Sequence, residues 1–366
     1  VALAASLVSA QTFTECDPTK RDDCPNPKAV GSKIVDIDFR KGANDFFTLA
    51  DGTSLKYDDN LGAVFSISKE TEAPTISSHE YIFFGQVDLT VRASRGIGVV
   101  TSFVLQSDDL DEIDWEWLGG DSKQVQTNYF SKGCTETYDR GGFSPVADPI
   151  NTFHTYTIKW TPEQLDWIID GTVVRSLKNS GLSGCAGYPQ SPMMIKLGTW
   201  VAGRKDAPQG TIEWAGGVTD FSQGPYEGYY QSVRIQDFMG GQGATEATEY
   251  RYTDRSGSWQ SIEVVNDGES VKPSSSATSK ASSKTSTAST TLSTVTSTAS
   301  TGSNSTTTTG VSSATGAPTG TFTSDTNAGV TSPPSAVPTG AAGKVAFNMA
   351  NVAALGVAAV LGYLVL

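Results

Sequence analysis

Three acidic residues alternate with large apolar residues between positions 111 and 119 of the chain. On a β-strand, Glu112, Asp114 and Glu116 would share one face while the apolar residues between them pack into the other, because successive side chains point in opposite directions. Such an alternation is often only a solvated surface. Like charges on one face repel each other, however, so the arrangement also indicates a functional site. Three carboxyl groups this close retain at least one proton near neutral pH, and they then offer both a general acid and a nucleophile.

The spacing of the two glutamates suits the cleavage of glycosidic bonds. Residues four apart on a strand have Cα atoms about 13 Å apart, at about 3.3 Å per residue. Side chains that lean inward bring Glu112 and Glu116 toward the roughly 5–5.5 Å between carboxyl groups that retaining glycosidases use. Without this lean they also reach the roughly 6.5–9.5 Å of inverting enzymes. The spacing therefore favours retention and leaves inversion open, while Asp114 can hydrogen-bond to the nucleophile and hold a shared proton.

A second segment, residues 193–200, contains side chains suited to sugar binding. Strand alternation places Lys196, Gly198 and Trp200 on one face. The indole of Trp200 offers a flat surface for the apolar face of a pyranose, Lys196 offers a donor for hydroxyl groups, and Gly198 offers room for a ring. A core position explains Trp200 equally well, although a lysine is rarely buried beside such a ring.

Two further segments add weaker binding candidates. Residues 210–217 contain the hydroxyl of Thr211 and the indole of Trp214, and for Trp214 a position in the core is favoured. The strand that follows the acids supplies polar and stacking side chains for which alternation is the only argument. These residues are Gln126, Asn128 and Phe130.

Composition narrows the possible partners and cofactors. The chain has 26 basic and 39 acidic residues and a formal net charge of −13, so it lacks the basic surface that nucleic-acid binding requires. Two histidines and four cysteines offer little for a metal site, and no phosphate- or dinucleotide-binding fingerprint is present. We therefore expect no metal and no cofactor. His79 and His154 have no nucleophile motif beside them and are predicted to be structural.

The pattern of residues 11–267 predicts one all-β domain. Short runs of alternating or β-branched residues, separated by turns, indicate an antiparallel β-sandwich or jelly roll. No stretch shows a sustained helical period. Asp51-Gly52 and Asp170-Gly171 are predicted to form hairpin turns. The clearest predicted strands are residues 34–39, 64–68, 85–93, 155–160, 164–169 and 229–238.

The two ends of the chain predict export. Residues 1–10 are small and apolar, and we interpret them as the remnant of a secretory signal peptide, with a buried N-terminal strand as the alternative. Residues 268–340 are rich in Ser and Thr with scattered Pro, which is typical of a disordered, O-glycosylated linker. The linker also contains an N-glycosylation sequon at Asn304.

The last segment, residues 341–366, ends in an apolar tail that predicts a GPI-attachment signal. The attachment residue would be Gly340 or Asn327. A single membrane span is the alternative, but the uninterrupted apolar part is shorter than the roughly 20 residues that a spanning helix needs. Either anchor would hold the folded part at the outer face of the plasma membrane.

Four cysteines outside the cell indicate two disulfides. Cys16 and Cys24 would close a short loop, which leaves Cys134 to pair with Cys185. The other two connectivities stay open, because pairing does not follow from the sequence alone.

The acid motif and its surroundings resemble glycoside hydrolase family 16, and in particular the fungal Crh branch of that family. The resemblance rests on residues 106–116, 126–130, 196–200 and 210–217, and it extends over most of residues 12–267. It implies a concanavalin-A-like jelly roll and a double-displacement mechanism. The Ser/Thr-rich linker and the anchor signal also match Crh-type proteins of the fungal cell wall.

The resemblance also implies roles for individual residues. Glu112 would be the nucleophile, Asp114 its assistant and Glu116 the acid/base. Enzymes of the Crh branch break a β-1,4 bond in chitin and pass the glycosyl-enzyme to a β-glucan or chitin acceptor, which cross-links the wall. The residues that would contact the chitin chain are Glu116, Lys196, Trp200 and Thr211.

Two other functions stay open at the level of the sequence. One is an endo-β-1,3(4)-glucanase of the same family, which hydrolyses its donor. The other is a non-catalytic carbohydrate-binding wall protein on the same sandwich. The intact Glu112, Asp114 and Glu116 argue against the second, because a binding protein has no need of mutually repelling acids.

Overall fold

The computed structural model describes residues 14–241 and 244–271. The predicted signal remnant, most of the predicted linker with Asn304, and the predicted anchor signal with Gly340 and Asn327 lie outside these residues. Within the described ranges, no helix is long and apolar enough to cross a membrane.

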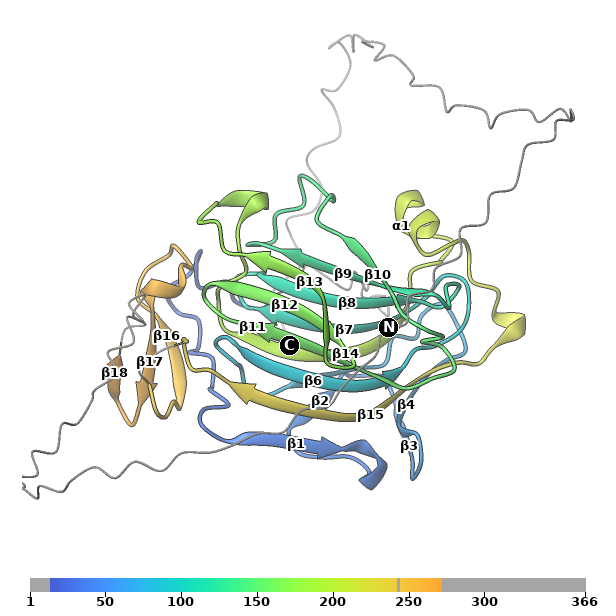
Figure 1. Cartoon of the computed structure of the whole chain (residues 1–366), viewed down its shortest axis with the longest axis horizontal. Helices are drawn as coiled ribbons and strands as arrows, with labels where there is room; N and C mark the ends of the chain where they lie inside the picture. Colours follow the sequence, from blue (N-terminus) through green and yellow to red (C-terminus); the bar gives the residue numbers. More distant parts are fainter. Residues whose placement is uncertain (1–13, 242–243, 272–366) are drawn as a thin grey trace, which may run out of the picture. The chain divides into compact units, whose positions relative to one another are not determined.

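Two antiparallel sheets lie face to face as a sandwich, and a smaller sheet lies at one end (Figure 1). The strands of the first sheet are β1 (Ile34–Asp38), β3 (Lys56–Asp58), β4 (Gly62–Ile67), β6 (Gly85–Arg92), β11 (His154–Trp160), β12 (Gln164–Ile169), β13 (Thr172–Lys178) and β15 (Tyr226–Asp237). Their order is β13-β12-β11-β6-β15-β4-β3, with β1 beside β15.

The second sheet carries the candidate site. Its strands are β2 (Phe47–Leu49), β5 (Thr75–Ser78), β7 (Val99–Ser107), β8 (Glu112–Leu118), β9 (Gln124–Phe130), β10 (Gly142–Pro145) and β14 (Met193–Val201). Their order is β10-β9-β8-β7-β14-β5-β2, which places β8 well inside the sheet. The small sheet consists of β16 (Glu249–Tyr252), β17 (Ile262–Asn266) and β18 (Glu269–Val271). The predicted antiparallel all-β jelly-roll sandwich is confirmed.

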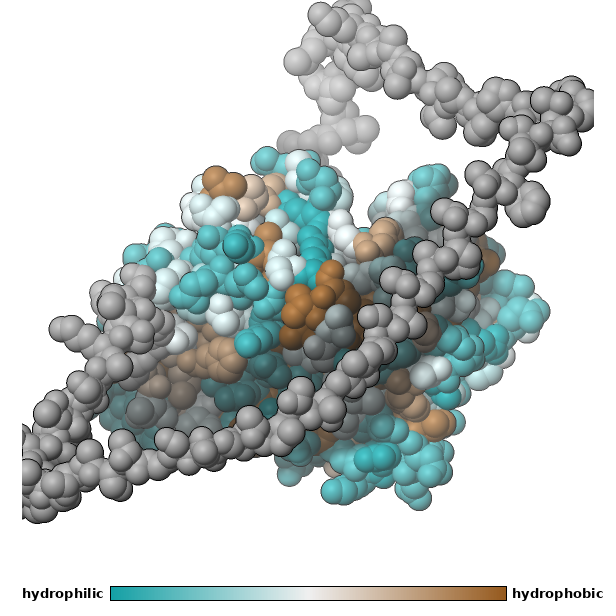
Figure 2. Space-filling view, in the orientation of Figure 1, coloured by the Kyte–Doolittle hydropathy of each residue, from teal (hydrophilic) through white to brown (hydrophobic). Residues whose placement is uncertain are grey.

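The core lies between the two large sheets and is built from the apolar residues that alternate along the strands. Trp115 and Trp117 of β8 are almost fully buried there. Tyr156 of β11 packs edge-on against both indoles, with ring centroids 5.3 and 4.6 Å apart. In β6, buried and half-buried residues alternate along the whole strand. The side of the molecule seen in Figure 2 combines hydrophilic surface with distinct hydrophobic patches.

The predicted strands correspond to β1, β4, β6, β11, β12 and β15. Asp170 and Gly171 adopt the left-handed conformation, with φ of 48° and 79°, and join β12 to β13 as a hairpin, as predicted. The hairpin predicted at Asp51-Gly52 is wrong. This dipeptide forms a turn, but the strands on either side of it, β2 and β3, belong to different sheets. Turn residues reverse the chain locally, whereas long-range packing decides which strands then pair.

One α-helix, α1 (Gln209–Trp214), is present among the described residues, where the sequence analysis expected none. It has six residues, which are too few to show a helical period in the sequence. The short 3-10 helices are η1 (Phe39–Lys41), η2 (Gly184–Ala186), η3 (Phe221–Gln223) and η4 (Trp259–Ser261).

Both predicted disulfides are confirmed. Cys16 pairs with Cys24, eight residues away, and Cys134 pairs with Cys185, 51 residues away. The second bridge ties the loop after β9 to the loop before β14, so it connects two segments that flank the second sheet.

Candidate active site

Strand β8 presents Glu112, Asp114 and Glu116 on the face opposite the core, as the alternation predicted. Backbone pairing with β7 and β9 fixes both edges of this strand. From the core side, the indole N–H of Trp167 donates a hydrogen bond of 3.0 Å to the main-chain carbonyl of Asp114. The carboxyl groups therefore project from a platform that is held on three sides.

The strand register brings other predicted residues beside the acids. The cross-strand pairs on β9 are Glu112 with Phe130, Asp114 with Asn128, and Glu116 with Gln126. On the opposite side, Gln106 of β7 pairs with Glu112, and Lys196 lies on the next strand, β14. Residues directly opposite one another share a face of the sheet. The acids and these neighbours thus form one continuous surface.

The three acids are almost completely buried, with exposed fractions of 1% for Glu112, 0% for Asp114 and 3% for Glu116. The amide Nε2 of Gln106 donates a hydrogen bond of 2.9 Å to Oε2 of Glu112. The ammonium group of Lys196 donates to Oε1 of the same amide. Lys196 therefore donates a hydrogen bond to Gln106, and Gln106 in turn donates one to Glu112.

Burial raises the pKa of all three carboxyl groups. For Glu112, burial and the charge of Glu116 raise the pKa to about 8, although hydrogen bonds with Asp114 and Gln106 and the charge of Lys196 lower it. Burial raises the pKa of Glu116 to about 7. The pKa of Asp114 lies well above its ordinary value because of burial, the charges of both glutamates and its hydrogen bond with Glu112. The cluster consequently retains protons at neutral pH.

Three oxygens of the Glu112 and Asp114 carboxyl groups lack a hydrogen-bond partner. Oε1 of Glu112 and both carboxyl oxygens of Asp114 are buried, and no described residue donates a hydrogen bond to them. If both groups were ionised, three buried acceptors would be left unpaired. The interaction between the two groups lowers the pKa of Glu112 and raises that of Asp114, so Asp114 holds its proton more tightly than Glu112 does.

A buried ion cluster that the sequence analysis missed fixes the turn before β8. The ammonium Nζ of Lys132 lies 2.9 Å from Oδ2 of Asp109 and 2.6 Å from Oδ2 of Asp111. Asp111 also accepts backbone N–H groups from residues 132 and 190, at 2.9 and 2.8 Å. Leu110, between the two aspartates, has a φ of +64°, which is uncommon for a leucine. The cluster anchors the residue immediately before Glu112.

Two tryptophans and a glutamine form a wall beside the acids. The rings of Trp200 on β14 and Trp214 on α1 stack, with centroids 6.1 Å apart and an interplanar angle of 26°. Nε1 of Trp214 donates a hydrogen bond of 2.6 Å to Oε1 of Gln126, which connects α1 to β9. Thr211 lies one helical turn before Trp214.

Neither indole belongs to the main core. Trp200 and Trp214 are half-buried and pack on a small cluster that is separate from the core between the sheets. The core position favoured for Trp214 is therefore wrong. The helical turn is the reason, because it lifts residues 209–214 out of the sheet and turns the indole toward β9.

Asn128 and Phe130 lie on the predicted face but are already engaged by the protein. Oδ1 of Asn128 accepts the backbone N–H of the next residue at 2.9 Å. Phe130 is buried, and the guanidinium group of Arg140 lies 4.9 Å from the centre of its ring. This cation–π contact occupies ring surface that was predicted to stack on a sugar.

Gly198 has a different purpose from the one that the sequence suggested. A Cβ atom at this position would lie 2.8 Å from Oγ1 of Thr75 on β5 and 3.3 Å from the carbonyl oxygen of Pro74. The glycine therefore allows close packing of β14 against β5, rather than leaving room for a sugar ring.

Both histidines make local polar contacts that fit a structural role. The ring of His154 lies 2.6 Å from a carboxylate oxygen of Asp170 and 2.8 Å from the carbonyl oxygen of Ala147. Nε2 of His79 lies 2.8 Å from the hydroxyl of Thr48.

Comparison with known proteins agrees with this geometry. The sequence model described as "Glycosyl hydrolases family 16" matches residues 42–216, which include all three acids. Crh-like protein 5 of Aspergillus fumigatus is 49% identical over 264 residues, or 71% of this chain and 65% of that protein. Crh-like protein 4 of Botryotinia fuckeliana is 45% identical over 278 residues, or 76% of this chain and 71% of that protein. The chain belongs to glycosyl hydrolase family 16, among its Crh-like proteins.

A solved structure supports the family-16 fold over the same region. The protein described as "Crh5 transglycosylase in complex with NAG" superimposes with a TM-score of 0.64 at 48% identity, covering 69% of this chain and 100% of that one. The chain spans about two thirds of the length of the curated relatives, since the matched segments make up 65% and 71% of the two named above.

Two residues of this family-16 site were given no role at the sequence level. Gln106 holds the nucleophile candidate, and its position follows from the β7–β8 hairpin, whose register alternation alone does not give. Asp108, in the turn, accepts a hydrogen bond of 2.9 Å from the hydroxyl of Tyr81, and burial raises its pKa to about 6. The charge of Lys196 lowers that pKa, so Asp108 lies near the same lysine as Glu112.

Proposed function

We propose that this chain is a retaining transglycosylase that cleaves β-1,4 bonds in chitin and transfers the chain to a β-glucan or chitin acceptor. The observation that carries the proposal is the set of three buried carboxyl groups on one face of β8. Binding alone would not require three acids that repel one another at the centre of a rigid sheet. The Crh-like relatives and the Crh5 transglycosylase structure support a transglycosylase activity.

In the first step, an ionised Glu112 attacks the anomeric carbon while Glu116 donates its proton to the departing glycosidic oxygen. The bond between the anomeric carbon and that oxygen breaks, and an ester to Glu112 forms. The hydrogen bonds from Gln106 and Asp114 stabilise the charged form of Glu112. A bound sugar excludes water from Glu116 and raises its pKa further, which keeps the acid protonated and leaves the negative charge on Glu112.

In the second step, Glu116 is a carboxylate and accepts the proton of an acceptor hydroxyl. The acceptor oxygen bonds to the anomeric carbon, and Glu112 departs with the electron pair of the ester bond. Two inversions retain the β configuration. Asp114 keeps its proton throughout and donates a hydrogen bond to the Glu112 carboxylate before the ester forms and after it breaks, as an assistant rather than a nucleophile.

Substrate binding follows from the surface around the acids. Lys196, which donates to Gln106, would also donate to a sugar hydroxyl, and the half-buried indole of Trp200 would stack on a pyranose. Thr211 and Trp214 would contact the same chain from α1. We further propose that the protein acts outside the cell in the wall, held by a GPI anchor after a glycosylated linker.

The test is product analysis by mass spectrometry on the full chain. A chito-oligosaccharide donor is incubated with a labelled laminari-oligosaccharide acceptor, and hybrid products that carry both sugars are expected. Shortened donor without hybrids would indicate a hydrolase. An untouched donor together with cleaved β-glucan would replace the proposal with the glucanase. The control is Glu112→Gln, which should yield no product while its thermal unfolding remains cooperative.

A further inference from the structure

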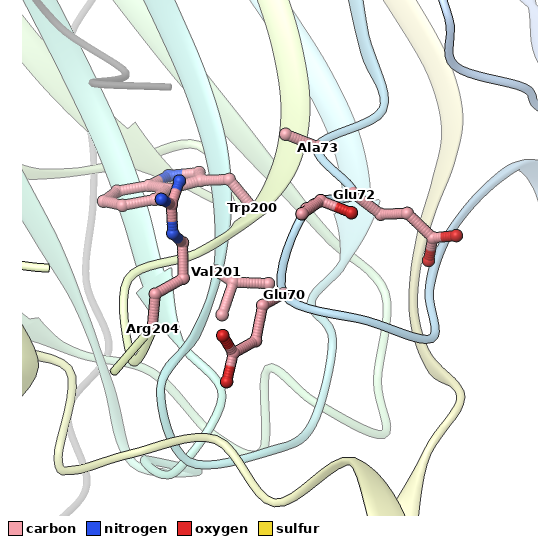
Figure 3. A pocket seen from close by; sticks show the side chains of 7 residues that line it. Glu70, Glu72, Ala73, Trp200, Val201 and Arg204 are labelled. Carbon is pink, nitrogen blue, oxygen red and sulfur yellow. The ribbon is translucent and has the colours of Figure 1, made fainter. Parts of the chain in front are cut away.

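A pocket lies at the end of the surface that carries Trp200, and no step of the mechanism uses it (Figure 3). It is a shallow depression of about 200 Å³, a volume that includes space open to solvent. The residues that line it are Glu70, Thr71, Glu72, Ala73, Trp200, Val201 and Arg204. Trp214 is not among them, so the pocket meets the indole of Trp200 away from its stacking partner.

The fold brings two loops together at this place. Strand β14 pairs with β5 through Gly198 and Thr75, and the backbone N–H of Thr199 donates to the carbonyl of Pro74 at 3.1 Å. This register puts the loop before β5, residues 68–74, directly beside Trp200. The loop after β14, which contains Arg204, closes the other side. The pocket therefore continues the binding surface of Lys196 and Trp200.

The protein orients the polar groups of the pocket, but part of their hydrogen-bonding capacity remains free for a ligand. Arg204 forms a bidentate pair with Asp206 at 2.9 and 2.6 Å, and its side chain is only 18% exposed. This pairing, and to a lesser degree the charge of Glu70, raises the pKa of Arg204. Glu70 itself accepts no hydrogen bond from any residue that the structure describes. Its carboxylate and the remaining N–H groups of Arg204 are thus available in the pocket that Trp200 also lines.

A site that combines an indole, a carboxylate and a guanidinium can recognise a neutral, hydroxylated ring. The carboxylate accepts from hydroxyl or amide N–H groups, the guanidinium donates to hydroxyl or carbonyl oxygens, and the indole covers the apolar face. The acidic side chains of Glu70 and Glu72, with Arg204 already paired to Asp206, disfavour an anionic ligand such as a phosphate.

We propose that this pocket is an additional subsite for one sugar residue of the donor chain, in which Glu70 and Arg204 determine how far the enzyme distinguishes long donors from short ones. The inference rests on the proposed function, because the chain that passes over Lys196 and Trp200 there is chitin. A donor long enough to reach the pocket gains contacts that a shorter donor lacks, and the reacting ring is unaffected.

The experiment measures binding as a function of donor length. Tryptophan fluorescence titrations with chito-oligosaccharides of increasing length are made on the full chain carrying Glu112→Gln, which leaves the donor intact. They are repeated with Glu70→Ala or Arg204→Lys added. Lys205→Ala, an exposed neighbour outside the pocket, is the matched control. We expect about a tenfold weaker Kd for the long donors, the typical effect of losing one charged hydrogen bond, with no change for the shortest bound donor.

Three results would overturn the inference. They are an unchanged length dependence in both variants, an equal weakening for all lengths, and an effect of Lys205→Ala as large as that of Glu70→Ala. Cooperative thermal unfolding of each variant excludes misfolding, and Glu70→Gln offers a milder change if Glu70→Ala is unstable. The proposed function is tested by a different experiment. If that function is wrong, wild-type protein gives no chitin–glucan hybrids even where chito-oligosaccharides bind.

Discussion

Replacement of Glu112 by glutamine is expected to abolish turnover and, at neutral pH, to stabilise the fold. Burial and the charge of Glu116 raise the pKa of Glu112 from 4.5 to about 8. In the unfolded chain this carboxyl is ionised at pH 7, whereas in the folded protein it binds a proton more tightly. The raised pKa of Glu112 therefore reduces the free energy of unfolding. The loss builds up between pH 4.5 and 7 and amounts to about 3 kcal/mol at about 1.4 kcal/mol per pH unit.

The amide avoids this penalty but weakens hydrogen bonding within the cluster, which costs about 1 kcal/mol. The net expectation is a gain of about 2 kcal/mol in the free energy of unfolding at pH 7, or a rise of roughly 4–8 °C in Tm for a domain of this size. Because the folded pKa is raised, the native state of the wild type binds more protons than its unfolded state between pH 4.5 and 8. Wild-type stability therefore falls as pH rises through this window, and the advantage of the variant disappears below pH 4.5.

The assay is thermal unfolding of wild type and Glu112→Gln between pH 4 and 8, together with activity on chito-oligosaccharides. Glu246→Gln is the control, because it removes one exposed carboxyl far from β8 in sequence. A variant that is inactive but equally or less stable than wild type at pH 7 would contradict the assigned electrostatics. A stability difference that does not vary with pH would contradict the raised pKa.

Three other predictions follow from the surroundings of the acids. Lys132→Ala leaves Asp109 and Asp111 buried without their cation and should destabilise the fold by about 3–5 kcal/mol in urea unfolding, whereas a loss below 1 kcal/mol would show that the cluster does not anchor the turn. Removal of the Cys134–Cys185 bridge by Cys185→Ser should lower the free energy of unfolding by about 4 kcal/mol, because the bridge closes a loop of 51 residues. An unchanged urea midpoint would be inconsistent with this. Gln106→Ala removes the donor to Oε2 and raises the pKa of the nucleophile, so kcat should fall at least tenfold and the acid limb of the pH–rate profile should move to higher pH; a uniform fall at all pH values would assign Gln106 a purely structural role.

The features that the sequence predicted well are those that depend on strand alternation. Once residues 112–118 form a strand, Trp115 and Trp117 enter the core and the acids lie on the other face, because no other arrangement buries both indoles. The same periodicity placed Lys196 and Trp200 on one face of β14. The hairpin at Asp170-Gly171 could be predicted because a two-residue turn with two left-handed residues connects neighbouring strands directly.

The features that the sequence did not predict depend on contacts between distant segments. The partnership of Lys132 with Asp109 and Asp111 joins two different loops, and the role of Gly198 is set by Thr75 on β5. Helix α1 is too short to reveal a period, so the position of Trp214 over Gln126 could not be read from spacing. In each case the decisive neighbour lies many residues away.

The most direct test of the account is capture of the glycosyl-enzyme. Glu116→Gln is incubated with an activated chito-oligosaccharide donor, whose good leaving group needs no acid, and the intact full chain is analysed by mass spectrometry. Because the amide cannot activate an acceptor hydroxyl, the ester should accumulate. It adds the mass of the donor's glycosyl chain without its leaving group, and peptide mapping should place it on Glu112. The adduct should be absent from a variant that also carries Glu112→Gln. Consumption of the donor without any adduct, or an adduct on another residue, would contradict the assignment of Glu112 as the nucleophile.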